Sequence, residues 1–285
     1  MEKISAEAKK RYSEKIKEYK QTVEEILAQA KQLDADIRQS GSEVSESEPN
    51  LIRLNLAGQY LNLVSYYILM NALSLSLLGI KNEGYLNDAR KSCYKAIICL
   101  EEIVTPYVDS PFSDYEDKLA SIDAADDRKK YNLVRKMGFS IDSVIEGFGE
   151  NSKWKWSFVE LRGRYAVISK NLINLKTFIA QMDPRVEGYY ERQAHLDLAK
   201  RLLQNSADGY REKYELSTLR LDDIKQAILF LSSLRRFHVL FGESDESDVI
   251  KKKMEIWKAK MDSDQKKQET ARKMEKMKNS QNRGR

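Results

Sequence analysis

Residues 54–80 read LNLAGQYLNLVSYYILMNALSLSLLGI and carry no formal charge over 27 positions. This run is unusual because charged residues make up 33% of the whole chain. After the polar turn at residues 81–84, an apolar stripe returns along residues 85–105 and stops before Pro106. The two segments predict a long helical hairpin, in which helix 51–79 is central and is buried by the remaining helices.

The same uncharged run is long enough to cross a bilayer, so a membrane-inserted helix is the alternative interpretation. Amide side chains are distributed along the run, and burying them in hydrocarbon would cost several kcal/mol. These are Asn55, Gln59, Asn62 and Asn71. The charged N-terminal residues also lack a secretory signal. Membrane insertion is therefore disfavoured, and we expect a cytoplasmic protein.

The composition favours long helices, because the 285 residues include only 12 Gly and 4 Pro. Cys93 and Cys99 lie six positions apart in one predicted helix, on different faces, so we expect reduced thiols in a reducing compartment. The sequence predicts an all-α fold, either an antiparallel helical bundle or a short solenoid of helical hairpins.

Residues 1–40 are predicted to form a long amphipathic helix. Its apolar residues recur at alternating steps of four and three, as Tyr12, Ile16, Tyr19, Val23, Ile26, Ala30, Leu33 and Ile37. Such a heptad seam packs either on the protein's own core or in a coiled coil that self-associates through residues 12–37. Residues 41–50 are interpreted as an acidic, polar linker that ends at a break around Pro49.

Residues 51–242 are assigned to one helical core domain. Beyond the hairpin, helices are expected at residues 126–146, 152–182, 184–205 and 218–241. Residues 243–285 form a basic tail, in which residues 246–285 contain 13 Lys and Arg against 7 Asp and Glu, a net charge of +6. Because the whole chain carries +5, the preceding residues together carry −1. The tail is expected to be helical at first. Its apolar residues thin out beyond Asp262, and its end, KNSQNRGR, is expected to be disordered.

Some small and apolar residues of the hairpin resemble the pattern of tetratricopeptide helical hairpins. They are Leu54, Ala57, Gly58, Leu61, Gly84, Ala89 and Ala96, and Phe158, Leu161 and Tyr165 are similar. The resemblance covers these fragments only, since the first helix is too long for that repeat and no period of about 34 residues recurs. It implies antiparallel helix pairs, and Gly58 is expected to allow a neighbouring backbone to approach closely.

The sequence contains no recognisable catalytic, metal or cofactor motif. Its two histidines, His195 and His238, lie outside any HExxH pattern and away from the cysteines, and no nucleophile elbow is present. We therefore predict no catalytic residues, no metal ligands and no cofactor. An α-helical enzyme with an unrecognised pocket, formed by residues such as Glu191, His195, Arg235 and His238, is kept as a second alternative.

Two cationic segments are candidate partner-binding surfaces. The first begins the helix predicted at 152–182 and comprises Lys153, Trp154, Lys155, Trp156, Arg162 and Arg164. The second lies in the tail and comprises Lys251, Lys252, Lys253, Lys266 and Lys267. Acidic peptides, phosphates or a nucleic acid backbone could pair with these cations, whereas tail lysines without interleaved aromatic residues indicate nonspecific attraction.

The leading hypothesis is a noncatalytic helical scaffold or adaptor that acts by protein–protein interaction. It rests on the continuous helical patterning and on the missing catalytic motifs. The alternative from another class is a protein associated with RNA or DNA through the basic tail and the Lys/Arg/Trp surface.

Overall fold

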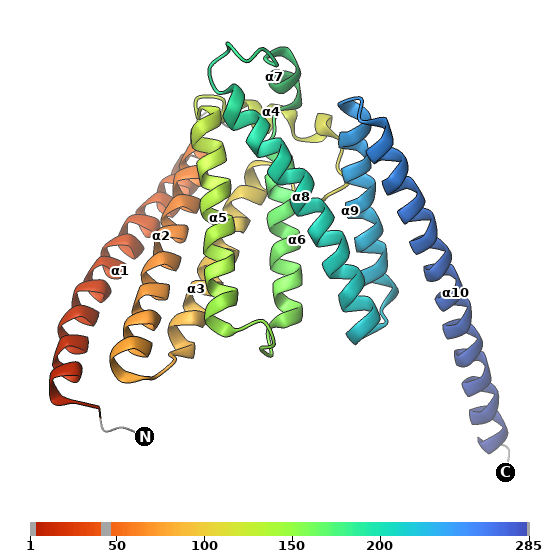
Figure 1. Cartoon of the computed structure of the whole chain (residues 1–285), viewed down its shortest axis with the longest axis horizontal. Helices are drawn as coiled ribbons and strands as arrows, with labels where there is room; N and C mark the ends of the chain where they lie inside the picture. Colours follow the sequence, from red (N-terminus) through yellow and green to blue (C-terminus); the bar gives the residue numbers. More distant parts are fainter. Residues whose placement is uncertain (1–3, 41–46, 284–285) are drawn as a thin grey trace. The chain divides into compact units, whose positions relative to one another are not determined.

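The computed structural model describes residues 4–40 and 47–283, and within these ranges every regular element is helical (Figure 1). This confirms the all-α fold. The chain divides into two compact units, residues 1–199 and 200–285. The division falls within a helix, whereas the sequence pattern placed a change of character at residue 243.

The first unit is built from antiparallel helices joined by short connections. Its elements are α1 (Ala6–Ser40), α2 (Ser47–Leu78), α3 (Glu83–Ile103), the 3₁₀ turn η1 (Phe112–Asp114), α4 (Glu116–Ala120), α5 (Asp127–Phe148), α6 (Lys155–Asn171) and α7 (Leu175–Ala180). Helix α8 (Tyr189–Lys213) contains the boundary between the units. The second unit continues with the π-helical turn η2 (Tyr214–Thr218), α9 (Leu221–Leu240) and α10 (Ser244–Arg283).

Helix α3 buries a continuous apolar stripe in the core of the first unit. It packs against α2, α5 and α6. Its apolar stripe has no exposed surface at Leu86, Ala89, Cys93, Ala96, Ile97, Leu100 and Ile103. Burying each such leucine or isoleucine stabilises the fold by about 1.5–3 kcal/mol. The centre of the unit is therefore the returning helix of the hairpin.

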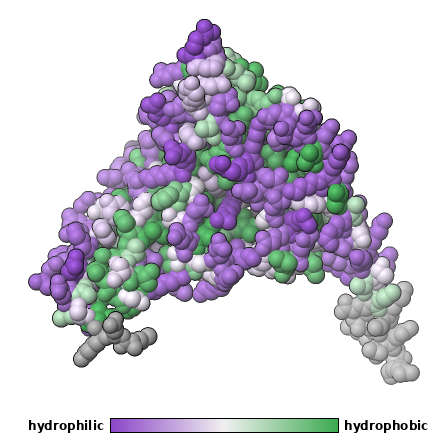
Figure 2. All heavy atoms as spheres, viewed as in Figure 1, coloured by the Kyte–Doolittle hydropathy of each residue, from purple (hydrophilic) through white to green (hydrophobic). Residues whose placement is uncertain are grey.

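Helix α2 is less enclosed than its composition predicts. Its inner side, including Leu61 and Val64, is buried, but Leu69 and Leu75 are 46% and 53% exposed. Among the described residues, α2 is the one helix long and apolar enough to cross a membrane, and only 33% of its most apolar window is buried. Figure 2 shows hydrophobic residues gathered where Figure 1 draws the lower half of α2. The prediction that this helix is wrapped on all sides is wrong.

The heptad seam of α1 packs within the same chain. Ile16, Val23 and Ile26 form a core cluster with Leu63 and Met70 of α2. The rings of Tyr19 and Tyr66 meet edge to face, with their centroids 6.0 Å apart. This packing favours the first of the two interpretations of the seam, and self-association through residues 12–37 stays a prediction.

Two glycines of α5 allow the neighbouring helices to approach closely. A Cβ atom on Gly138 would lie 2.6 Å from the Tyr165 hydroxyl of α6, and one on Gly147 would lie 2.5 Å from Leu86 Cδ2 of α3. The Tyr165 hydroxyl also donates a hydrogen bond of 3.0 Å to the Val134 carbonyl. At Gly58 no atom lies within 4 Å of such a Cβ, so the close approach predicted there is wrong.

Three element boundaries differ from the sequence-based expectations. Pro49 lies in the first turn of α2, where the absence of an N–H is tolerated, and the rest of the predicted linker, residues 41–46, lies outside the described residues. The helix predicted at 152–182 is interrupted after Asn171, because the Asn174 side chain accepts a hydrogen bond from Thr177 N and starts α7.

The third difference is the tail, in which helix α10 continues past Asp262 as far as Arg283, into the end that was expected to be disordered. Contacts with the rest of the second unit continue past that point. Tyr214 donates to Asp264 at 2.8 Å, and Gln268 donates to the Leu219 carbonyl at 3.0 Å. Polar pairs four residues apart, such as Gln265 and Glu269, add local support.

Replacing Leu100 by Ala should destabilise the protein by about 2–5 kcal/mol, because a fully enclosed side chain leaves a cavity. Leu75→Ala on the exposed side of α2 is the matched control, and it should change the free energy of unfolding by less than about 0.5 kcal/mol. Urea denaturation of both variants checks this. Equal effects would contradict the central position of α3.

Candidate partner-binding surfaces

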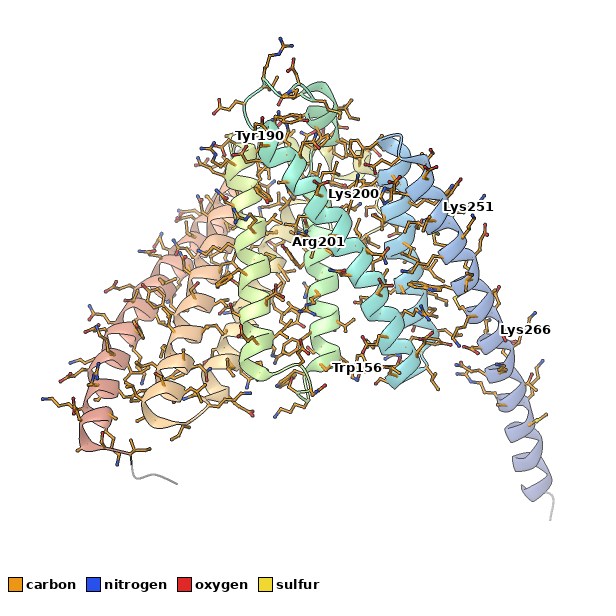
Figure 3. The ribbon with its side chains drawn as sticks, in the orientation of Figure 1. Trp156, Tyr190, Lys200, Arg201, Lys251 and Lys266 are labelled. Atoms are coloured by element: carbon orange, nitrogen blue, oxygen red, sulfur yellow. The ribbon has the colours of Figure 1, made fainter. Side chains whose placement is uncertain are left out.

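The predicted Lys/Arg/Trp surface lies at the start of α6, where Trp154 anchors the helix. The Arg90 guanidinium of α3 lies 4.0 Å from the centroid of the Trp154 ring. The Phe148 ring at the end of α5 meets it edge to face at 6.2 Å. Trp156 is half-buried, lies near the N-terminal end of α6 (Figure 3), and has the Lys155 ammonium 4.8 Å from its ring. Trp154 therefore joins α3, α5 and α6.

Carboxylates of the same unit neutralise most cations of this surface. Arg164 makes a two-pronged ion pair with Glu101, at 2.8 Å from Nε and 2.5 Å from Nη2. This bond raises the pKa of Arg164 above its usual value. Two further pairs are Lys153–Glu83 at 3.7 Å and Arg162–Asp142 at 3.2 Å. An anionic partner would have to compete with these carboxylates, so the surface offers less positive potential than its composition indicates.

The five tail lysines point in different directions around α10. Lys251 and Lys266 lie on the side of α10 that faces away from α9 (Figure 3). Lys267 lies 3.5 Å from Asp264. Lys252 and Lys253 instead line a groove together with residues that the sequence analysis did not select. The structure therefore divides the predicted set between two sides of the helix.

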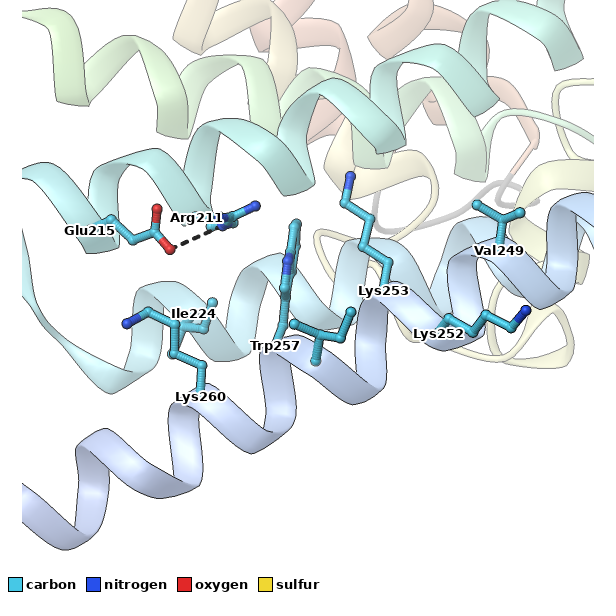
Figure 4. Close-up of a pocket in the computed structure, with 9 residues that line it drawn as sticks. Arg211, Glu215, Ile224, Val249, Lys252, Lys253, Trp257 and Lys260 are labelled. Atoms are coloured by element: carbon cyan, nitrogen blue, oxygen red, sulfur yellow. Dashed lines mark hydrogen bonds and ion pairs between the residues drawn. The ribbon is translucent and has the colours of Figure 1, made fainter.

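This groove lies between the end of α8, the start of α9 and the first half of α10, and it has a volume of about 420 Å³ (Figure 4). Its lining is Arg211, Glu215, Ile224, Val249, Lys252, Lys253, Ile256, Trp257 and Lys260. We call it the α8–α10 groove. The lining contains four cations and one carboxylate beside its apolar side chains.

Trp257 forms the floor of the α8–α10 groove and is only 4% exposed. Arg211 and Lys253 lie against its ring at 5.3 Å and 4.9 Å, one on either side in Figure 4. Arg211 also pairs with Glu215 at 3.1 Å, and Lys253 pairs with Asp208 at 2.8 Å. An aromatic residue therefore does lie among the tail cations, which corrects the view of the tail as lysines without aromatic partners.

An irregular turn joins the two helices that border the groove. The chain passes through the π-helical turn η2 and then through Leu219, whose φ of 49° is unusual for a residue with a branched side chain. Leu216 and Leu219 are 69% and 60% exposed. The Leu219 carbonyl accepts the hydrogen bond from Gln268 of α10, which fixes the turn to that helix. π-Helical turns occur frequently at functional sites.

The sequence contained a signal for this groove that the analysis did not use. Val249, Lys253, Ile256 and Lys260 follow steps of four, three and four, so they form one stripe along α10. The contributions of Arg211 and Ile224 come from other helices, and no spacing in α10 could indicate them.

A second cluster of polar residues is enclosed in the first unit around His195. Arg192 donates to Asp127 at 2.6 Å and to the carbonyls of Glu187 and Gln181 at 2.9 and 3.0 Å. His195 Nε2 lies 2.9 Å from the Ser169 carbonyl, which can only accept, so Nε2 carries the proton and donates. The cavity beside them measures about 20 Å³, which is too small for an organic substrate.

The residues of the alternative enzyme hypothesis are divided between the two units. Glu191 pairs with Arg128 at 3.0 Å at the surface of the first unit. His238 belongs to the second unit, where its Nδ1 lies 2.6 Å from Glu243, a carboxylate that also binds Lys200. Among the described residues, no group of three or more His, Cys, Asp or Glu side chains is arranged to hold a metal ion.

His195 should make the stability of the protein depend on pH. Burial, partly offset by the bond to Ser169 and by Asp127, lowers the pKa of His195 to about 4, against about 6.5 in an unfolded chain. The neutral His195 ring makes its full contribution to the free energy of unfolding above pH ~6.5, and this contribution is lost as the pH falls toward ~4. Lowering the pH from about 7.5 to about 5 should therefore cost about 2 kcal/mol at this site alone.

Urea denaturation at the two pH values measures this loss, and His195→Gln is the control in which the titration is absent. The variant should lose less stability on acidification than the unmodified protein. NMR titration of the His195 ring gives the pKa without any substitution. A midpoint near 6.5, or equal pH dependence of the two proteins, would contradict the assignment.

The comparisons with other proteins place the chain in a family. No curated protein and no solved structure matches it significantly. The profile of the TP0443 family matches residues 8–265, which span α1 to the middle of α10 and include the whole lining of the α8–α10 groove. Because this match covers most of the sequence, the chain belongs to the TP0443 family.

Proposed function

We propose that this protein is a noncatalytic helical scaffold or adaptor of the cytoplasm that acts by protein–protein contact. The observation that carries the proposal is the uncovered apolar side of α2. Leu69, Ala72 and Leu75 lie at steps of three along this side, and all three are exposed. Contiguous apolar surface of this kind marks interaction sites in soluble proteins.

The chemistry of this side suits another protein surface. Its side chains carry no charge, so a partner can cover them without desolvating an ion. The space around Gly58 is open, which permits close approach by a partner helix. Covering the apolar area would contribute about 25 cal/mol per Å² of surface removed from water, and this gain has to exceed the entropy cost of association.

Polar contacts along α2 support a helix in a water-soluble protein rather than in a bilayer. Lys136 of α5 donates to Asn62, and Arg53 pairs with Glu102 of α3 at 2.8 Å. The Asn71 side chain accepts a hydrogen bond of 2.8 Å from Asn82 N in the turn after the helix. Such charged and amide groups would be costly within hydrocarbon.

The state of the two cysteines supports the cytoplasm as the compartment. Cys93 and Cys99 are unbridged thiols within the buried stripe of α3. Burial raises the pKa of each thiol to about 12, so both stay protonated and unreactive at neutral pH. Unpaired buried cysteines are typical of proteins from reducing compartments.

The carboxylates paired with Lys153, Arg162 and Arg164 favour this proposal over nucleic acid binding. Neutralised cations contribute little to phosphate binding, because affinity for DNA or RNA depends on the number of phosphates that a protein neutralises.

Affinity purification from cell extract with the full chain as bait tests the proposal. We expect specific proteins to be recovered. Leu69→Lys with Leu75→Lys should lower their recovery at least ~10-fold, because two ammonium groups would be buried in the contact. Val239→Lys, at a position that is 59% exposed on α9, is the matched control and should keep the recovery unchanged.

Light scattering of the purified protein shows whether the partner is a second copy. A dimer that dissociates in the α2 variant would support contact through α2. Recovery of no protein by a monomeric bait would overturn the proposal. Flotation of the protein with phospholipid vesicles, lost in the same variant, would assign the apolar side of α2 to a membrane instead.

A further inference from the structure

The α8–α10 groove offers a line of exposed apolar side chains along one helix. Val249 and Ile256 of α10 are 63% and 67% exposed and lie seven residues apart. Beneath them, Trp257 and Ile224 are buried, at 4% and 1% exposure. The groove therefore has an apolar floor and two aliphatic side chains that the described residues leave largely exposed.

Cations border this apolar line. Lys252 and Lys260 are exposed, and Figure 4 shows Lys252 at the end of the groove opposite the Glu215 carboxylate. Arg211 and Lys253 lie deeper, where their carboxylate partners hold them against Trp257. Lys260 also pairs with a carboxylate, Asp264, at 3.2 Å. Among the described residues, Lys252 is the lining cation without an ion pair, so the groove favours an apolar ligand that carries a carboxylate near Lys252.

We propose that the α8–α10 groove binds an acidic amphipathic helix of a partner protein. This inference rests on the proposed scaffold function and names one of its surfaces and the class of partner. The stripe from Val249 to Lys260 extends about 16 Å along α10, which corresponds to about three turns of a bound helix. Apolar residues at steps of three and four on that helix contact Val249 and Ile256, and its flanking carboxylates pair with the lysines.

The geometry excludes an extended peptide as the main form of ligand. A peptide strand binds by adding to the edge of a sheet, and the walls of this groove are helices whose backbone groups are bonded internally. An amphipathic helix needs only side-chain contacts, and those are what the groove provides.

A single-stranded nucleic acid fits the groove less well. Bases are held by stacking on exposed aromatic rings, and the Trp257 ring is enclosed between Arg211 and Lys253. The side chains that remain accessible, Val249 and Ile256, are aliphatic and suit leucine or isoleucine partners.

Fluorescence anisotropy with the full-length protein tests this inference. The probes are a labelled helical peptide of ~16 residues with a leucine stripe flanked by glutamates, the same peptide with lysines in place of glutamates, and a single-stranded DNA of mixed sequence. We expect saturable binding of the glutamate peptide and at least ~10-fold weaker binding of the lysine peptide.

Two pairs of variants locate the binding. Ile256→Asp should lower the affinity for the glutamate peptide at least ~10-fold. Val239→Asp, at a similarly exposed position outside the groove, should leave this affinity unchanged. Lys252→Glu should lower the affinity for the glutamate peptide ~3–10-fold, whereas Lys251→Glu at the adjacent residue should change this affinity less than ~2-fold. These residues are all exposed, so the variants should keep their circular dichroism and denaturation profiles.

Equal affinity for both peptides, no binding of the glutamate peptide, or equal effects within either pair would overturn the inference. Binding of the DNA alone would assign the groove to nucleic acid. Affinity purification with Ile256→Asp separates this inference from the proposed function. If the variant recovers every protein that the unmodified bait recovers, the groove assignment fails and the scaffold function stands. If the unmodified bait recovers none, the scaffold function fails first.

Discussion

The enclosure of α3 is the interaction on which the first unit depends. Helices α2, α5 and α6 pack against α3, and the side chains of its inner stripe, from Leu86 to Ile103, lose all contact with water. Glycines supply the space for this packing, since Gly147 lets Leu86 lie against the α5 backbone. With α3 enclosed, α2 has to share its apolar surface between the core and the outside. The uncovered side of α2 is thus a consequence of which helix occupies the centre.

Charge is distributed differently in the two units. At the start of α6, cations lie opposite carboxylates from α3 and α5, as in the Arg164–Glu101 pair. In the second unit, Arg211 and Lys253 are also paired, but their partners hold them beside Trp257, and Lys252 extends along an open groove. The net charge of a basic segment therefore does not describe its surface, because the surroundings of each cation differ.

Periodicity predicted the individual helices well and their ends less well. The seam of α1 and the stripe of α3 were both visible as steps of three and four, and both are buried. The interruption after Asn171 was missed, because apolar residues continue through Leu172 and Leu175 while the Asn174 side chain caps a new helix. The contacts that hold α10 beyond Asp262 could not be read from the tail, because they come from Tyr214 and Leu219, which lie far away in the sequence.

The amino-acid sequence by itself determined that the protein is helical, that an uncharged helix opens a hairpin in its core and that its end is basic. Each of these follows from composition and from repeats within a single segment, which local physical chemistry governs. Only the tertiary structure decided that α3 is more enclosed than α2 and that the cations of α6 meet carboxylates. It also decided that Trp257 lies between Arg211 and Lys253. These relations join residues that are dozens of positions apart, and packing between helices, not spacing along one helix, selects them.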